Sequence, residues 1–370
     1  MKSSEQYIRR VLFDLNRRVN DATTFKEKHF YRAYIYSIIE GLQNTGIDIN
    51  IPDSILQKSN LFDNTIDNDF NSQVIYDFRA NRDFYREFGK LSEATIGYFE
   101  EDSYKYIEKV SFDDSIDIAR GFLSYYDNNM ARHFDRLLDE KLVDVFLPYT
   151  EDAESYDGFT YHFPGDTDLI ITLDKGNIET AATIIHELVH SFLSLYDINM
   201  TYDQDTRKCV NNLNETYSKF IEIVFMKYLS DIGFNKTDIA SYMRNFNSML
   251  YESLDVFDDC LNDKEKYLFG NDFGIYWEAQ RNAFGGVLAY HYYDKYLDRP
   301  YLVKQDLLDL YQESKFKSKS YLLDNCGLRK KDIVKPKVLV MRMNDFEERD
   351  VFDNAIYIIT IVKDGPELLL

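Results

Sequence analysis

The strongest constraint on this chain lies in residues 183–193, which combine an apolar helix with three ionisable side chains. The stretch reads Thr-Ile-Ile-His-Glu-Leu-Val-His-Ser-Phe-Leu, and its apolar positions leave almost no polar face. A helix that is apolar on all sides belongs in a protein core. Two imidazoles and a carboxylate carried into a core destabilise the fold unless a partner satisfies them. The stretch therefore predicts a buried helix whose polar side chains share a partner.

The spacing of these side chains indicates a metal ion as that partner. His186 and His190 are four residues apart, so both rings leave the same side of the helix and can bind one ion. Glu187 lies beside them, where it can take a proton from a metal-bound water. The same short pattern also arises by chance on exposed helices, where it has no function. The apolar surroundings favour a site for one zinc ion.

A second helix, over about residues 210–229, offers the third ligand that a catalytic zinc site needs. Glu215 and Glu222 are seven residues apart and so lie on one stripe of this helix. We expect Glu222 to bind the metal and Glu215 to accept a proton from a ligand imidazole. The alternative is that both are solvent-facing carboxylates, which an otherwise apolar helix disfavours.

The hydrophobic period changes to that of strands in residues 158–173, around a Pro-Gly-Asp turn. Two short strands are predicted directly before the histidine helix. An edge strand there can pair with an extended peptide, and a small sheet that only covers a helical core is the alternative. The residues expected to bind a peptide are Gly158, Phe159, Leu169, Ile170 and Ile171.

Elsewhere the pattern is mainly helical, with apolar residues three and four positions apart. Residues 115–145 form one strongly periodic segment, whereas residues 338–343 and 355–362 read as strand-like or buried. Asn177 is expected to cap the histidine helix. His29 and His133 stand alone among charged residues, which favours structural roles for both.

Composition narrows the classes of partner. The net charge of −21 disfavours nucleic acid and anionic membrane surfaces. The three cysteines lie far apart, which excludes a disulfide framework or a zinc knuckle. The N-terminus has no apolar signal segment and no stretch is long enough to span a membrane, so a cytoplasmic protein is expected. The oligomeric state is left open.

In their order and spacing these motifs resemble the M3 zinc metallopeptidases, the thimet oligopeptidase and oligoendopeptidase F group. That family carries a Gly-aromatic strand, a further apolar strand, His-Glu-x-Gly-His and a later Glu-x-x-Ser-x-x-x-Glu. The counterparts here are Gly158-Phe159 and residues 169–173, 186–190 and 215–222. The resemblance covers residues 113–300. Val189 replaces the family glycine, and Leu193 stands where another histidine is common.

The resemblance implies a mainly α, zincin-like (gluzincin) fold with a small β-sheet and two helical lobes around a cleft. Residues 1–110 would form an N-terminal lobe and residues 111–370 the zincin-like catalytic region. One zinc ion would be bound by His186, His190 and Glu222, with Glu187 as the general base. The activity implied is that of a zinc metalloendopeptidase cleaving short peptides.

The family also places a His and a Tyr near the negative charge that develops during hydrolysis. Here Tyr276 is the first candidate, with His291 or Tyr290 next. Two other functions stay open: a peptide-binding protein that has lost turnover, and a zinc hydrolase of non-peptide amides.

Overall fold

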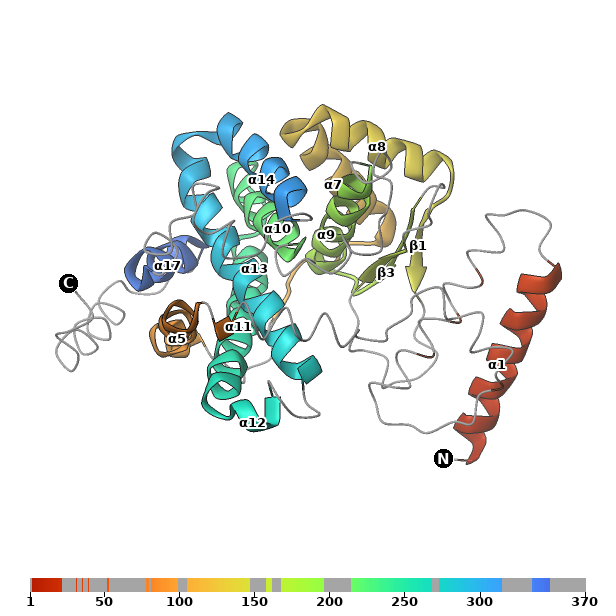
Figure 1. Cartoon of the computed structure of the whole chain (residues 1–370). Coiled ribbons are helices and arrows are strands. Elements are labelled where there is room, and N and C mark those ends of the chain that lie inside the picture. The colour runs from red at the N-terminus through yellow and green to blue at the C-terminus, as the bar shows by residue number, and fades with distance from the viewer. Residues whose placement is uncertain are drawn as a thin grey trace.

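The computed structural model is mainly helical, with one small sheet (Figure 1). It describes residues 2–21, 78, 79, 81–98, 105–146, 158–161, 168–195, 214–267, 273–314 and 335–346, and single positions 31, 35, 39 and 52. The helices in this part of the chain are α1 (Lys2–Asp21), α5 (Arg82–Gly89), α6 (Leu91–Thr95), α7 (Phe112–Tyr126), α8 (Asn128–Asp139), α9 (Ile178–Ser194), α10 (Asn214–Asp231), α11 (Lys236–Asn262), α12 (Lys264–Tyr267), α13 (Phe273–Asp298), α14 (Pro300–Ser314) and α17 (Pro336–Met343). Short 3-10 turns follow at Ile96–Tyr98 and Asn344–Phe346.

The sheet has three strands in the order β1-β3-β2. β1 (Val143–Phe146) runs parallel to β3 (Leu169–Leu173), and β2 (Gly158–Tyr161) runs antiparallel to it. β3 is therefore the central strand and β2 an edge strand among the strands that the structure describes. This agrees with the two strands predicted before the histidine helix.

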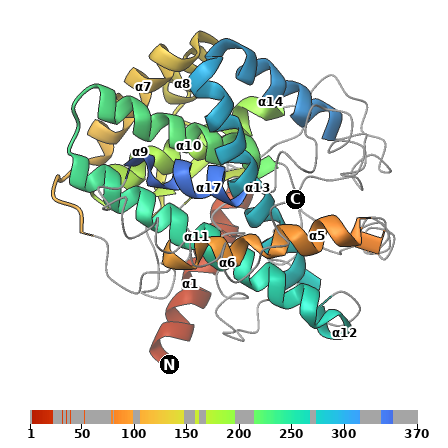
Figure 2. The ribbon, with the colours of Figure 1, turned by 90° about the vertical axis from the view of Figure 1, so that its left-hand side faces the viewer.

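The core is built around α9, which packs on the sheet through β2 and β3 and on the helices α7 and α10 (Figure 1). α10 lies in turn between α9 and α13. Figure 2 shows α11 beside α5 and α6, which pack against it. Thirteen of the seventeen residues of α9 are buried, so this helix meets protein on nearly every side, as its sequence predicts.

Side-chain caps fix where the central helices begin. Asn177 accepts a hydrogen bond from the backbone N–H of Glu179 at the start of α9, which confirms the predicted cap. Gly176 directly before it has φ +66°, a left-handed conformation that glycine adopts without strain. The chain thus turns sharply from β3 into α9, so the histidine helix returns across the sheet.

Two segments differ from the sequence-based expectation. Residues 143–145 belong to β1, not to the preceding helical segment, because Lys141 at φ 58° turns the chain out of α8. Residues 338–343 form part of helix α17, which begins at Pro336, and only the prediction of burial holds, for Leu339, Val340 and Met343. Residues 355–362 and His29 lie outside the described residues, and the boundary at residue 110 stays a prediction.

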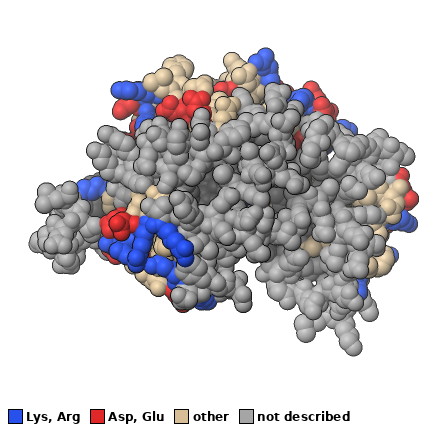
Figure 3. Space-filling view, viewed as in Figure 1, with Lys and Arg blue, Asp and Glu red and all other residues tan. Residues whose placement is uncertain are grey.

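Among the described residues on the face seen in Figure 3, Lys and Arg side chains gather over α5. Burial and the charges of Arg82 and Arg86 lower the pKa of Lys264, which lies close to both. In the described part of the chain, no helix combines the length and the apolar character needed to cross a bilayer.

His133 ties α8 to α9 in the core. Its Nε2 lies 2.8 Å from the Ser191 hydroxyl, and Arg136 donates to Nδ1 at 3.3 Å. The imidazole is therefore neutral with its proton on Nε2. Burial, helped by the charge of Arg136, lowers its pKa from 6.5 to about 4.

Acid should accordingly weaken the fold through His133. Above pH 6.5 the ring is neutral in both states, but between pH 6.5 and 4 only the unfolded chain takes up a proton. We expect the free energy of unfolding to fall by about 2 kcal/mol from pH 7 to pH 5 through this group. Urea unfolding of the wild type and His133→Gln tests this, because the variant should lack that share of the pH dependence. Parallel pH profiles would contradict it.

Candidate metal centre

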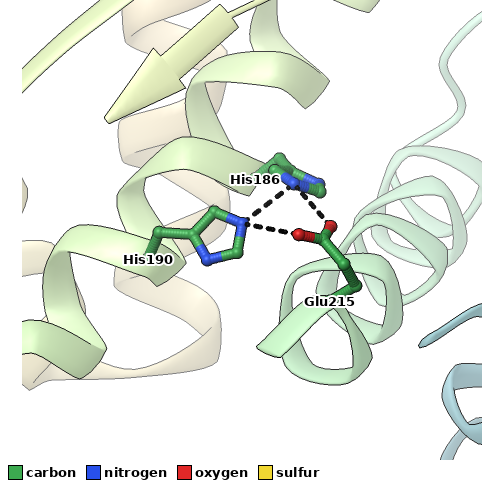
Figure 4. Close-up of side chains that lie close together, drawn as sticks. All are labelled: His186, His190 and Glu215. Carbon is green, nitrogen blue, oxygen red and sulfur yellow. Dashed lines mark hydrogen bonds and ion pairs between the residues drawn. The ribbon is translucent and has the colours of Figure 1, made fainter. Parts of the chain in front are cut away.

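His186 and His190 project from the same side of α9, one turn apart (Figure 4). Their Nε2 atoms face each other at 3.1 Å. At most one N–H can lie between two such nitrogens, so this arrangement is made for a shared partner rather than for the pair alone. The two side chains are 19% and 18% exposed, which leaves them reachable from solvent while their helix is buried.

The carboxylate of Glu215, from α10, completes the cluster (Figure 4). Its Oε2 lies 3.3 Å from His186 Nε2 and its Oε1 lies 3.7 Å from His190 Nε2. Burial disfavours its charge, but His190, His186 and Arg281 outweigh burial and hold its pKa well below the usual range. Glu215 is therefore an anion aimed at two imidazole nitrogens.

This donor set fits a zinc ion. Zinc bonds of about 2.0–2.1 Å in a tetrahedral arrangement place neighbouring ligand atoms about 3.3 Å apart. The separations of 3.1, 3.3 and 3.7 Å match that value. Two imidazoles with one carboxylate are also an established catalytic set that leaves a fourth position open.

Glu222 lies on the other side of His186. Its Oε1 is 2.5 Å from His186 Nδ1, and Tyr242 of α11 donates its hydroxyl proton to the other oxygen. Burial disfavours a charged His186, but Glu222 and Glu215 outweigh it and raise the pKa of the imidazole well above 6.5. A carboxylate at Nδ1 directs the lone pair of Nε2 toward a metal ion.

The two carboxylates thus occupy the reverse of the positions expected from sequence. Glu215 joins the Nε2 atoms of both histidines, whereas Glu222 is bonded to the Nδ1 of one. Both residues lie on one stripe of α10, as predicted, and the way α10 crosses α9 decides which of them reaches the cluster. The geometry favours Glu215 as the third ligand and Glu222 as the residue that orients His186.

Glu187 is held by the edge strand. The hydroxyl of Thr160, on β2, lies 2.8 Å from both Glu187 Oε2 and the Glu187 carbonyl oxygen. β2 can come this close to α9 because Gly158 has no side chain: a Cβ there would lie 2.6 Å from Thr183 Cγ2. The carboxylate of Glu187 is therefore fixed between the histidine helix and the sheet.

The predicted peptide-binding residues fall into two groups. Gly158 and Phe159 lie on the edge strand β2, whose second backbone edge pairs with no described strand. Leu169, Ile170 and Ile171 lie on the central strand β3, which pairs on both sides, and their side chains are buried. Among the described strands β3 therefore has no free edge at Ile170 and Ile171, which pair with both neighbours, and peptide binding by the five residues stays a prediction.

The predicted Tyr and His donors lie elsewhere on α13. Tyr276 is fully buried, packs on Phe257 and accepts a hydrogen bond from Gln280, so it cannot reach a substrate. Tyr290 is buried too and donates to Asn247. His291 packs on Tyr292 and is not part of the cluster. Core packing therefore accounts for Tyr276 and Tyr290, the two buried aromatic residues among these candidates.

Two residues of α13 that the sequence analysis missed lie at the site. Gly285 faces α10 directly, since a Cβ there would lie 2.6 Å from Glu215 Cβ. Arg281, one turn earlier, places Nη1 3.7 Å from Glu215 Oε1. Polar residues spaced along one face of an aromatic-rich helix, at 278, 281 and 282, were the available signal.

The exchanged carboxylate roles can be separated by zinc affinity. Glu222→Gln should weaken zinc binding about 10- to 100-fold, as is typical of a residue that orients a ligand. Glu215→Gln should weaken it further, because a metal ligand is lost. Competition titration against a chelator measures both. The opposite order would restore Glu222 as the ligand.

Gly285 provides an independent test of whether the close contact between α10 and α13 positions Glu215. Gly285→Ala should displace Glu215 and lower zinc affinity about 10- to 100-fold. The matched control is Gly286→Ala, whose Cβ meets the flexible end of Leu250 instead. Equal zinc affinities for the two variants would show that the backbone contact does not position Glu215.

Comparison with known proteins places the fold. No family model and no curated protein matches this sequence. Solved structures do: a protein from Chlamydophila abortus assigned as a peptidase (14% identity, 87% of this chain and 62% of that chain, TM-score 0.45) and one from Bacillus anthracis str. Ames assigned as an oligoendopeptidase F (12%, 87% and 66%, 0.48). The chain spans less than two thirds of the length of these two.

PZ peptidase A, solved with an inhibitor, matches with a TM-score of 0.51 at 11% identity, over 94% of this chain and 76% of that one. At such identity the likeness concerns the fold alone. It confirms the predicted fold class, mainly helical with a small β-sheet, as a fold found in peptidases.

Proposed function

We propose that this protein is a zinc-dependent metallopeptidase that hydrolyses peptide bonds of short peptides. The observation that carries the proposal is the cluster of His186, His190 and Glu215 at zinc-ligand separations, with Glu187 on the same helix. The fold shared with PZ peptidase A supports it. The cluster is the stronger support of the two, because a fold alone does not define an activity.

The chemistry divides between the metal and the chain. A bound zinc ion would lower the pKa of water and polarise a carbonyl group. Glu187 takes the proton as the water oxygen forms its bond to the carbonyl carbon, and the π electron pair moves onto the carbonyl oxygen. Glu187 then passes the proton to the amine nitrogen, while the electron pair on the oxygen re-forms the C=O bond and the C–N bond breaks.

The edge strand suits an extended peptide. β2 carries Thr160, which holds Glu187, so a peptide paired with β2 would run past the general base. Strand pairing forms hydrogen bonds to the peptide main chain and not to its side chains, which is consistent with short peptides of varied sequence as substrates.

The decisive experiment combines zinc content with cleavage of a mixed library of peptides of about ten residues, long enough for strand pairing. Wild type should bind one zinc ion and cleave. Glu187→Gln should keep the zinc and lose at least about 100-fold in cleavage rate, because the general base is gone. Glu252→Gln, an exposed carboxamide substitution on α11, is the matched control and should cleave normally.

Each other outcome has a meaning. Zinc bound without cleavage by the wild type would favour a peptide-binding protein or a hydrolase of non-peptide amides. A protein that takes up no zinc would contradict the site. Unchanged cleavage by Glu187→Gln would remove Glu187 from the mechanism.

A further inference from the structure

Arg281 is a positively charged residue of α13 that lies beside the cluster of His186, His190 and Glu215. Gly285 marks where α13 meets Glu215, and Arg281 lies one turn earlier on the same face. Its Nη1 is 3.7 Å from Glu215 Oε1, and its Nη2 donates to Glu278 Oε1 at 2.7 Å. The side chain is 37% exposed, so a ligand in solvent can reach it.

Most hydrogen-bonding capacity of this guanidinium is unused among the described residues. Arginine has five N–H donors in a planar fork. Only Nη2 makes a hydrogen bond here, since 3.7 Å to Glu215 is too long for one, and Nε is buried without a partner. An arginine with unused N–H donors beside a candidate active centre is suited to an anionic group brought by a ligand.

The charges around Arg281 also favour an anionic group of a ligand as its partner. Glu215 is the carboxylate of the cluster, and its negative charge would be drawn to a bound metal. The charge of Arg281 also interacts with Glu187, the candidate base. When Glu187 takes a proton, the negative charge it gives up reappears on the carbonyl oxygen of the peptide, at the same site.

We propose that Arg281 binds a negatively charged oxygen of the substrate. This rests on the proposed peptidase function and names a residue that touches the substrate in place of the Tyr and His first expected, because Tyr276 is buried in the core. The oxygen is either the carbonyl oxygen as it becomes anionic or a carboxylate of the bound peptide, and both suit a guanidinium.

Binding measurements distinguish the two possible oxygens, the developing oxyanion and a peptide carboxylate. The probes are based on a peptide that the wild type cleaves. One probe carries a phosphinate in place of the scissile amide and an amidated C-terminus, and is titrated into zinc-loaded protein. The other two are the intact peptide with a free and with an amidated C-terminus, titrated into metal-free protein. The variants are Arg281→Met, Arg281→Lys and the control Lys295→Met, which removes a positive charge about 21 Å further along α13.

Arg281→Met should weaken phosphinate binding about 100-fold if the anion is the developing oxyanion. If the anion is a carboxylate, the variant should instead bind the free-acid peptide no better than the amidated one. Arg281→Lys should recover part of the loss in either case, and Lys295→Met should bind all three probes as the wild type does.

Two results would overturn the inference. One is wild-type affinity of Arg281→Met for all three probes. The other is a fall in zinc affinity as large as the fall in phosphinate affinity, since Arg281 would then only position Glu215. A wild type that binds neither zinc nor the phosphinate would instead refute the proposed function itself, and this inference with it.

Discussion

The structure depends on one constraint: two imidazoles on a helix that is otherwise almost entirely buried. His186 and His190 are mostly covered because the rest of α9 is packed in the core, so most of their polar atoms must be satisfied by the protein. α10 meets this need with Glu215 at the Nε2 atoms and Glu222 at Nδ1. The polar cluster therefore forms only when α10 packs on α9.

Neighbouring elements extend this arrangement outward. α11 supplies Tyr242 to Glu222, β2 supplies Thr160 to Glu187, and α13 comes close at Gly285. Each contact fixes a polar group that another helix presents. Substitution of any one of them is expected to change the geometry of the candidate site first and overall stability second.

The helices, two of the strands and the group of His186, Glu187 and His190 follow from local sequence patterns. The period of three and four residues determines the helices, and the period of two in residues 158–173 determines two strands, because each pattern buries one face only in that conformation. Residues 338–343 differ from the expectation because short apolar runs fit a helix and a strand equally well. Residues 143–145 differ because the turn at Lys141 ends the helical segment before them. The location of Tyr276 could not be predicted, because an aromatic side chain suits a core and an active site alike.

The sequence by itself determined that His186 and His190 lie on one side of a buried helix, with Glu187 next to them, because four-residue spacing is a property of a single helix. It also determined that Glu215 and Glu222 share one stripe. Only the tertiary structure decided which carboxylate lies at the Nε2 atoms of both imidazoles, that β3 is the central strand while β2 is an edge among the described strands, and that Arg281 lies beside Glu215. These depend on how separate elements cross, and a helix crossing is set by side-chain packing across the whole core, not by the spacing of residues within one element.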